Sequence, residues 1–294
     1  MRSPAVASRG LSRITLSGGV QNATQRCELP APSVAVRNLV EQAQHAHLCT
    51  VMSAMHHRRA GYPFGTAVEF AADGAGHPIL CLSPLALHMR NLLEDPRASL
   101  VMNLPGWTGL ANARVTMFGD VRELPASSQA DALDLFQDKY AQQFSLGGPD
   151  SARKPPRWLS ANRRFFCMDR IQDVYFVGGF GTVQWVDVEE YLSAKPDAIV
   201  MDNPALVLKT LSDRFAVRLF RKLGCKTGKK EDAKKEDAAA AAAPAADAAV
   251  ISIDRLGADV RVGSGADTSV ERIAADRDIL TLDDALAVFE QFLA

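Results

Sequence analysis

The stretch from residue 47 to 122 constrains the fold most, because it alternates strand-like runs with short turn signals. A Gly-rich turn at 73–76 joins the runs TAVEFAA and PILCLS, which is typical of a β-hairpin. A helix is predicted between Pro84 and Pro96, and the runs ASLVMNL and ARVTMFGDVREL follow it. The stretch therefore predicts an antiparallel sheet with one helical crossover. A bound molecule would lie between the strands and the N-terminus of that helix.

The segments on either side extend this sheet. An amphipathic helix is predicted over residues 34–47, with Ser33 as its N-cap, followed by a strand at 48–54 that is buried on both faces. A second helix is predicted at 126–143, and the aromatic and β-branched runs RRFFCMD and DVYFVGGFG predict two further strands. The sheet then has at least six strands. The predicted buried faces are Val36, Leu39, Val40 and Ala43 on the first helix and Ala130, Leu133, Phe136 and Tyr140 on the second.

The C-terminal part is predicted to form a second, smaller α+β unit. Its hairpin turns at Leu256 and Gly257, a further strand is expected within TSVERIAAD, and Thr281 caps the last helix. A charged and Ala-rich run precedes this unit and has the composition of a solvated linker. The predicted organisation is a transit peptide or disordered terminus at 1–30, a main domain at 33–200, a helix at 203–224, the linker at 225–249 and the small domain at 250–294.

Composition excludes several classes of protein. A net charge of −1 provides no basic field for nucleic acid, and no apolar run approaches the roughly 20 residues of a membrane span. The five cysteines lack CxxC spacing, which argues against a disulfide framework or a zinc site. The first 27 residues contain four arginines and no acid, as organelle transit peptides do, although a disordered terminus has a similar composition.

Three segments resemble a known family. The run GYPFGTAVEFAADGAGHPILCLSPLALHMRNLLEDPRASLVM, then ARVTMFGDVREL and VGGFGTVQWVDV, are similar to the FMN-binding split-barrel superfamily of pyridoxamine 5′-phosphate oxidase-like proteins. Within it, the similarity is to the haem-binding and haem-degrading HugZ-type branch and its chloroplast relatives. The resemblance covers residues 35–190 and implies an antiparallel split β-barrel with flanking helices. The tail SIDRLGADVRV resembles the small domain of this branch, but the helix before it lacks that branch's His-rich run.

The resemblance implies haem or, alternatively, FMN as cofactor. Haem needs an axial ligand and basic groups for its propionates. All six histidines lie between residues 45 and 88, so a histidine ligand must come from the barrel. FMN-dependent oxidases of the superfamily hold their substrate with a C-terminal Arg-x-His, which this chain lacks.

The candidate cofactor-binding residues lie on the loop before the second strand, around the crossover helix and on two later strands. His88, at the family's L-A-x-H-x-x-N position, is the candidate iron ligand, and a hydrogen bond to the backbone is its structural alternative. The aromatic residues Trp107, Tyr175, Phe180 and Trp185 are candidates for the walls of a macrocycle site, or for the core or a dimer interface. The complete set of candidate cofactor-binding residues is His56, His57, Arg58, Arg59, Ser83, His88, Arg90, Asn91, Arg114 and Trp185.

The resemblance implies a function in tetrapyrrole metabolism. The first expectation is a chloroplast homodimer that binds haem and degrades it. The alternatives are a non-catalytic regulator that binds an enzyme of tetrapyrrole synthesis, as the glutamyl-tRNA reductase-binding protein does, and an FMN-dependent oxidoreductase.

Overall fold

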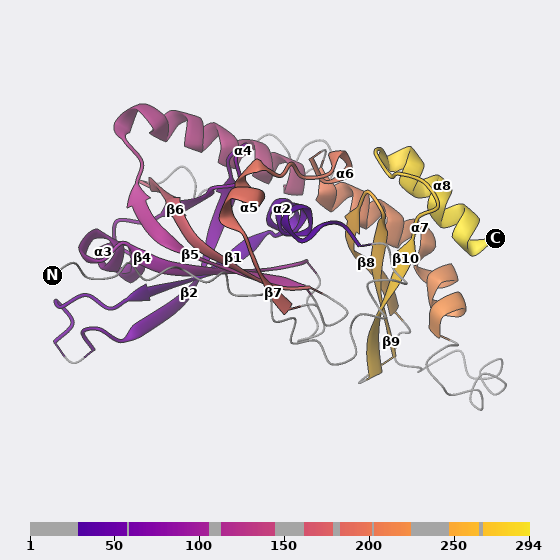
Figure 1. Cartoon of the computed structure of the whole chain (residues 1–294), viewed down its shortest axis with the longest axis horizontal. Helices are drawn as coiled ribbons and strands as arrows, with labels where there is room; N and C mark the ends of the chain where they lie inside the picture. Colours follow the sequence, from indigo (N-terminus) through magenta and orange to yellow (C-terminus); the bar gives the residue numbers. More distant parts are fainter. Residues whose placement is uncertain are drawn as a thin grey trace, which may run out of the picture.

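The computed structural model describes residues 29–57, 59–105, 113–144, 162–178, 183–201, 203–224, 247–264 and 267–294 (Figure 1). Seven strands form one antiparallel sheet in the order β3-β2-β1-β4-β5-β6-β7, and pairing of β3 with β6 closes the first six into a barrel. A separate three-stranded sheet has the order β10-β9-β8. The predicted fold class is confirmed. The strands of the larger sheet are β1 (His45–Val51), β2 (Pro63–Ala72), β3 (Pro78–Leu82), β4 (Arg97–Asn103), β5 (Arg114–Glu123), β6 (Arg164–Val177) and β7 (Val183–Val186).

The first strand shows how alternation builds the barrel. In β1, Ala46, Leu48 and Thr50 are buried, while the residues between them are exposed or half-buried. Leu48 pairs with Leu100 of β4, and both lie in the main core. The prediction of a strand at 48–54 buried on both faces was therefore wrong, because only one face of β1 meets the core and the strand begins at His45.

Helix α2 (Pro32–Gln42) lies between the barrel and the second sheet in Figure 1. Its predicted buried face is confirmed, since Val36, Leu39 and Val40 are at most 2% exposed. The helix ends earlier than predicted because the chain has already entered β1 at His45. Ser33 is not its N-cap. Ala31 occupies that position without a side-chain hydrogen bond, and Pro32 begins the helix.

One long strand, β6, replaces the two strands predicted from RRFFCMD and DVYFVGGFG. Between the two runs, Arg170 and Gln172 are polar but stay in the strand, because both are exposed. The pairing of β5 with β6 shifts register before Gly119 and again after Asp120. A Cβ atom at Gly119 would lie 2.4 Å from the Arg170 carbonyl oxygen, so glycine permits this close crossing.

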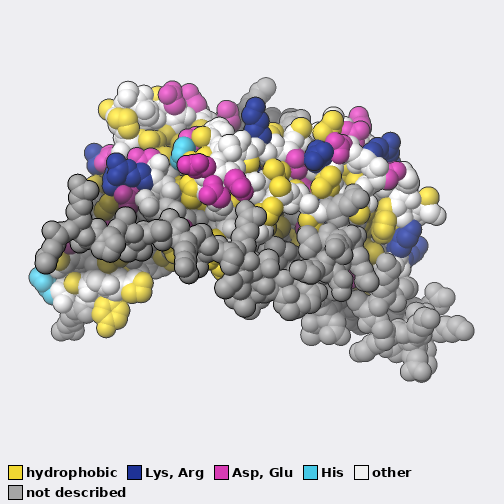
Figure 2. Space-filling view, in the orientation of Figure 1, with side chains coloured by type: hydrophobic (Ala, Val, Ile, Leu, Met, Phe, Trp, Pro, Cys, Tyr) yellow, Lys and Arg dark blue, Asp and Glu magenta, His cyan; other side chains and the backbone are white. Residues whose placement is uncertain are grey.

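The remaining barrel helices cover its surface. They are α3 (Leu87–Glu94), α4 (Gln129–Phe144), which follows a 3-10 turn at Ala126–Ser128, and α5 (Val188–Ser193). Phe136 and Tyr140 of α4 are buried as predicted, but Ala130 is exposed and Ala132 is buried in its place. In Figure 2, acidic and basic side chains are interspersed over the part of the face that is drawn in colour, in keeping with the small net charge. No helix in the described ranges is long and apolar enough to cross a membrane.

The C-terminal unit has its own core. It contains α6 (Ala198–Met201), α7 (Pro204–Gly224), β8 (Asp247–Asp254), β9 (Gly257–Ser264), β10 (Asp267–Ala274) and α8 (Leu282–Leu293). The predicted hairpin turn at Leu256 and Gly257 is confirmed, and so is the Thr281 cap, which forms a capping box with Asp284. The run predicted as a linker ends sooner, since β8 starts at Asp247, and residues 225–246 lie outside the described residues.

Two side chains of α2 join the barrel to the C-terminal unit. Gln42 accepts a hydrogen bond from the Ile253 amide at 3.0 Å and donates one to the Ile253 carbonyl oxygen at 3.1 Å. Asn38 donates to the carboxylate of Asp197 at 2.7 Å and accepts from its amide at 2.8 Å. Asp197 also accepts from the Arg255 amide at 3.0 Å. Because these polar groups satisfy one another, the junction is specific as well as buried.

Lys139 of α4 is half-buried and lies next to the C-terminal end of α2. The Lys139 ammonium group donates to the Ala43 carbonyl oxygen at 2.9 Å and lies 3.9 Å from the ring centre of Phe70. Burial lowers the pKa of Lys139 to about 8, although Glu41 and Glu69 oppose the shift. Burial also raises the pKa values of both glutamates. The cluster therefore titrates differently in the folded and unfolded chains.

We expect wild-type stability, relative to Lys139→Met, to increase as the pH rises from about 8 to about 10.5. In this window the unfolded chain binds more protons, because its lysine keeps an ordinary pKa, so the free energy of unfolding increases with pH. Urea unfolding of both proteins at several pH values measures the difference. Parallel stability curves would contradict the lowered pKa.

Candidate functional site

The loop between β1 and β2 is fixed to helix α3 by side-chain hydrogen bonds. Asn91 accepts from the Ser53 amide at 3.0 Å and donates to the Thr50 hydroxyl at 2.9 Å, and Glu94 accepts from the Ala54 amide at 2.9 Å. Asn91 is completely buried. Its amide therefore connects the crossover helix to β1 and has no surface open to a ligand in this conformation.

Four of the predicted residues lie on that loop. His56 is half-buried, and its Nε2 atom has no hydrogen-bond partner among the described residues. His57 and Arg59 are exposed. Arg58 lies outside the described residues, as do Trp107 and Phe180. The loop thus brings one imidazole with an unbonded ring nitrogen close to solvent-exposed basic groups.

His88 occupies the first turn of α3, as predicted, and is half-buried. Burial lowers its pKa, and the positive charge of Arg163 lowers it further. The imidazole is therefore neutral at pH 7, the form in which histidine ligates iron. Near it, Ser83 accepts a hydrogen bond from the Leu85 amide at 3.3 Å in the turn before the helix, and Arg90 is exposed.

Arg114 lies on β5 and Trp185 on β7. Both strands come later in the strand order than β2 and β1, which carry the loop with His56. Arg114 begins β5 and pairs with Val177 of β6, whose other neighbour is Val183 of β7. Trp185 is 63% exposed and packs against Tyr175 with ring centres 5.0 Å apart and against Phe118 at 6.1 Å. The predicted residues thus form two groups, one on the loop and α3 and the other on β5 and β7.

A groove of about 540 Å³ opens on the outer face of the barrel, and we call it the barrel groove. Cys49 lies in it opposite Gly65 of β2, and a Cβ atom at Gly65 would lie only 3.7 Å from the thiol sulfur. The missing side chain at Gly65 leaves the thiol half-buried rather than covered. The groove is lined by Cys49, Thr50, Val51, Pro63, Arg97, Ala98, Ser99, Phe118, Gly119, Asp120 and Gln172.

The barrel groove has a charged end and an aromatic wall. Arg97 bonds Asp95 at 2.6 and 2.9 Å, and its hydrogen bond lowers the pKa of Asp95, which keeps the pair charged. Phe118 is 38% exposed and forms the wall next to Trp185. Thr50 lines the groove and also bonds Asn91, so the groove and the β1–β2 loop share one strand. None of the ten predicted cofactor-binding residues lines this groove.

The sequence contained only weak signals for the barrel groove. Its residues come from five strands, and each is placed there by strand register, as Cys49 is by its pairing with Ser99 and Gly65. A glycine inside a β-rich run, such as Gly65, often marks a place where another group approaches the backbone. That signal alone identifies neither the thiol nor Arg97.

A closed six-stranded antiparallel barrel with a crossover helix, followed by a small α+β unit, defines a split-barrel protein. Residues 26–193 match the family model described as "CREG, beta-barrel". This match covers more than half of the chain, and the protein belongs to the CREG β-barrel family. The resemblance to split-barrel proteins inferred from the motifs is confirmed.

Two relatives extend the comparison beyond the barrel. The chain is 26% identical over 247 residues to the chloroplastic heme oxygenase HOZ of Arabidopsis thaliana, covering 80% of this chain and 67% of that protein. A solved heme-binding protein from Mycobacterium smegmatis has 22% identity and a TM-score of 0.51, with 90% of this chain and 97% of that chain covered. The first is a distant homologue, and the second has the same fold.

Proposed function

We propose that this protein binds haem on the outer face of its barrel and degrades it. The observation that carries the proposal is the similarity to the heme oxygenase HOZ over 80% of the chain. Because the matched part is longer than one unit, it involves the C-terminal unit as well as the barrel. The Mycobacterium smegmatis protein is described as a heme-binding protein, so its ligand is the same. That comparison bears on the fold alone.

The residues of the barrel groove suit a haem. A macrocycle needs a flat apolar wall, cations for its propionates and an axial ligand. Phe118 would pack against the ring and Arg97 would pair with a propionate. The axial ligand would be the thiolate of Cys49, which lines the groove, whereas His88 and His56 lie outside it. Bound haem would supply the iron at which oxygen is activated, while these side chains bind and orient it.

The groove is open to solvent on one side, which favours a second copy of the chain as its cover. We therefore also propose a homodimer. The exposed aromatic pair of Phe118 and Trp185 at the edge of the groove would be buried in it. Sedimentation velocity with and without haemin tests this, and a monomer in both samples would contradict it.

Titration of the full chain with haemin tests binding, with FMN as the comparison ligand. We expect a shifted Soret band that saturates at one haem per chain, and its loss in ascorbate and air with release of iron. Replacement of the axial ligand would change the spectrum, so Cys49→Ala should change it, whereas His88→Ala and His56→Ala, outside the groove, should not. Arg97→Gln should weaken binding without moving the band. A flavin spectrum, or no spectral change with haemin, would overturn the proposal.

Location in the chloroplast is proposed from the homologue and from the Arg-rich, acid-free N-terminus. Residues 1–28 of that segment lie outside the described residues. Import into isolated chloroplasts checks it, and a precursor that stays outside and uncleaved would contradict it.

A further inference from the structure

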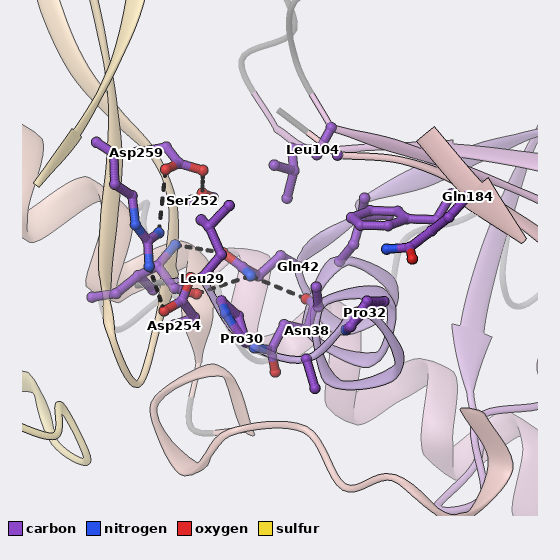
Figure 3. A pocket seen from close by; sticks show the side chains of 18 residues that line it. Leu29, Pro30, Pro32, Asn38, Gln42, Leu104, Gln184, Ser252, Asp254 and Asp259 are labelled. Atoms are coloured by element: carbon purple, nitrogen blue, oxygen red, sulfur yellow. Dashed lines mark hydrogen bonds and ion pairs between the residues drawn. The ribbon is translucent and has the colours of Figure 1, made fainter. Parts of the chain in front are cut away.

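A second cavity lies between the barrel and the C-terminal unit, and we call it the interunit cavity (Figure 3). Its volume is about 270 Å³. Protein interiors contain few voids larger than a water molecule, so an opening of this size is unusual at a well-bonded junction. It shares no lining residue with the barrel groove. The interunit cavity is therefore a separate site from the proposed haem site.

The walls of the interunit cavity are mostly apolar. Leu39 of α2 forms one wall, and Leu104 and Phe176 of the barrel form another. Ile253 of β8 faces them from the C-terminal unit. The amides of Asn38 and Gln42 also line the cavity, but they are bonded to Asp197 and Ile253. These polar groups hold the two units together and are not available to an occupant.

One end of the cavity is charged. Arg272, whose side chain is 1% exposed, bonds Asp254 at 2.7 Å and Asp259 at 3.2 Å. Ser252 donates to Asp259 at 2.6 Å. One guanidinium against two carboxylates leaves a formal charge of −1 there, which repels a propionate, a phosphate or any other anion. The Nε–H of Arg272 has no acceptor among the described residues, so this end retains one unused donor.

The opposite end carries one polar side chain. Gln184 of β7 is half-buried, and Figure 3 shows its amide on the barrel side, facing the α2 residues across the cavity. Its side-chain amide makes no hydrogen bond to the residues that the structure describes. Buried or half-buried amides in proteins are usually bonded, so an unused amide at a cavity wall is available to an occupant.

We propose that the interunit cavity binds a neutral, largely apolar small molecule that carries a carbonyl oxygen, which accepts a hydrogen bond from the Gln184 amide. The apolar walls supply most of the binding, and the amide fixes the orientation, as in other small-molecule sites. The negative charge around Arg272 excludes anionic ligands. The ligand bridges the barrel and the C-terminal unit and so stabilises their junction.

The test uses prodan, a neutral naphthalene with one carbonyl group whose fluorescence reports the polarity around it. We expect a blue shift that saturates at one molecule per full-length chain, with a raised melting temperature. The anionic dye 1-anilinonaphthalene-8-sulfonate should not displace prodan. Failure of prodan to bind the full chain, or its displacement by the anionic dye, would overturn the proposal.

Two variants locate the site. Ala35→Trp places a large ring against the cavity wall and should weaken prodan binding at least tenfold, while Ser33→Trp, on the same helix outside the cavity, should not change it. Gln184→Leu keeps the volume but removes the amide. Gln184→Leu should weaken prodan binding about three- to tenfold. The affinity of unsubstituted naphthalene, measured by its competition with prodan, should stay unchanged. Prodan affinity unchanged in both Ala35→Trp and Gln184→Leu would contradict the assignment.

Discussion

Arg272→Met is expected to lower the free energy of unfolding by about 3–5 kcal/mol, because it leaves two carboxylates close together without their cation. Asp254 and Asp259 both bond the Arg272 guanidinium, and Asp254 is 8% exposed. Burial already raises the pKa of Asp254 while Arg272 opposes the shift, so removing the cation raises it further. Urea unfolding followed by circular dichroism measures the loss.

The pH dependence separates this effect from lost packing. In Arg272→Met the Asp254 carboxylate binds a proton more readily in the folded chain than in the unfolded one. The deficit should therefore shrink as the pH falls from 7 toward 5. Arg214→Met is the control, since it removes an exposed ion pair with Glu290 and should change stability little. A pH-independent deficit, or one no larger than the control, would contradict the buried-charge explanation.

Gly257→Ala is expected to destabilise the C-terminal unit by about 3 kcal/mol, combining backbone strain with a steric clash. Gly257 has φ +155°, and a Cβ atom there would lie 2.2 Å from the Ile273 carbonyl oxygen on β10. The strand paired with it must move away, which breaks the β9–β10 ladder where it starts. The melting temperature of the variant measures the effect.

Gly74→Ala is the matched control for that substitution. Gly74 lies in the β2–β3 hairpin, and a Cβ atom there meets nothing within 4 Å. It should leave stability unchanged or slightly higher, because alanine restricts the unfolded chain. Equal losses in the two variants would show that glycine flexibility, and not the contact with β10, sets the cost.

The sequence predicted the strands of both sheets well where turn residues separate alternating runs. The hairpin at Gly74 and Gly76 and the turn at Gly257 are examples. It failed at β6, because charged residues such as Arg170 look like a loop in sequence but are tolerated on the outer face of a barrel. It also failed at His45, where helical periodicity continued past the point at which pairing with Glu69 of β2 begins.

The site was harder to predict because residue type does not reveal a side chain's partner. Asn91 is polar and lies at a position associated with cofactors, yet its amide is fully used in holding Ser53 and Thr50. Cys49 and Arg97 lie on separate strands and meet in one groove only through the β1–β4 register. Register depends on long-range pairing, which alternation within one strand does not encode.

The contact between Gln42 and Ile253 has a consequence for how the two units move. The Gln42 side-chain amide bonds both the N–H and the C=O of Ile253. It therefore makes the same pair of hydrogen bonds that one residue of a neighbouring antiparallel strand would make. It defines one docked arrangement, since a shift of one residue would present Ser252 or Asp254 with a different pattern of donors and acceptors. The amide proton of Ile253 should therefore exchange with solvent only when the units separate, and its exchange rate would report that opening directly.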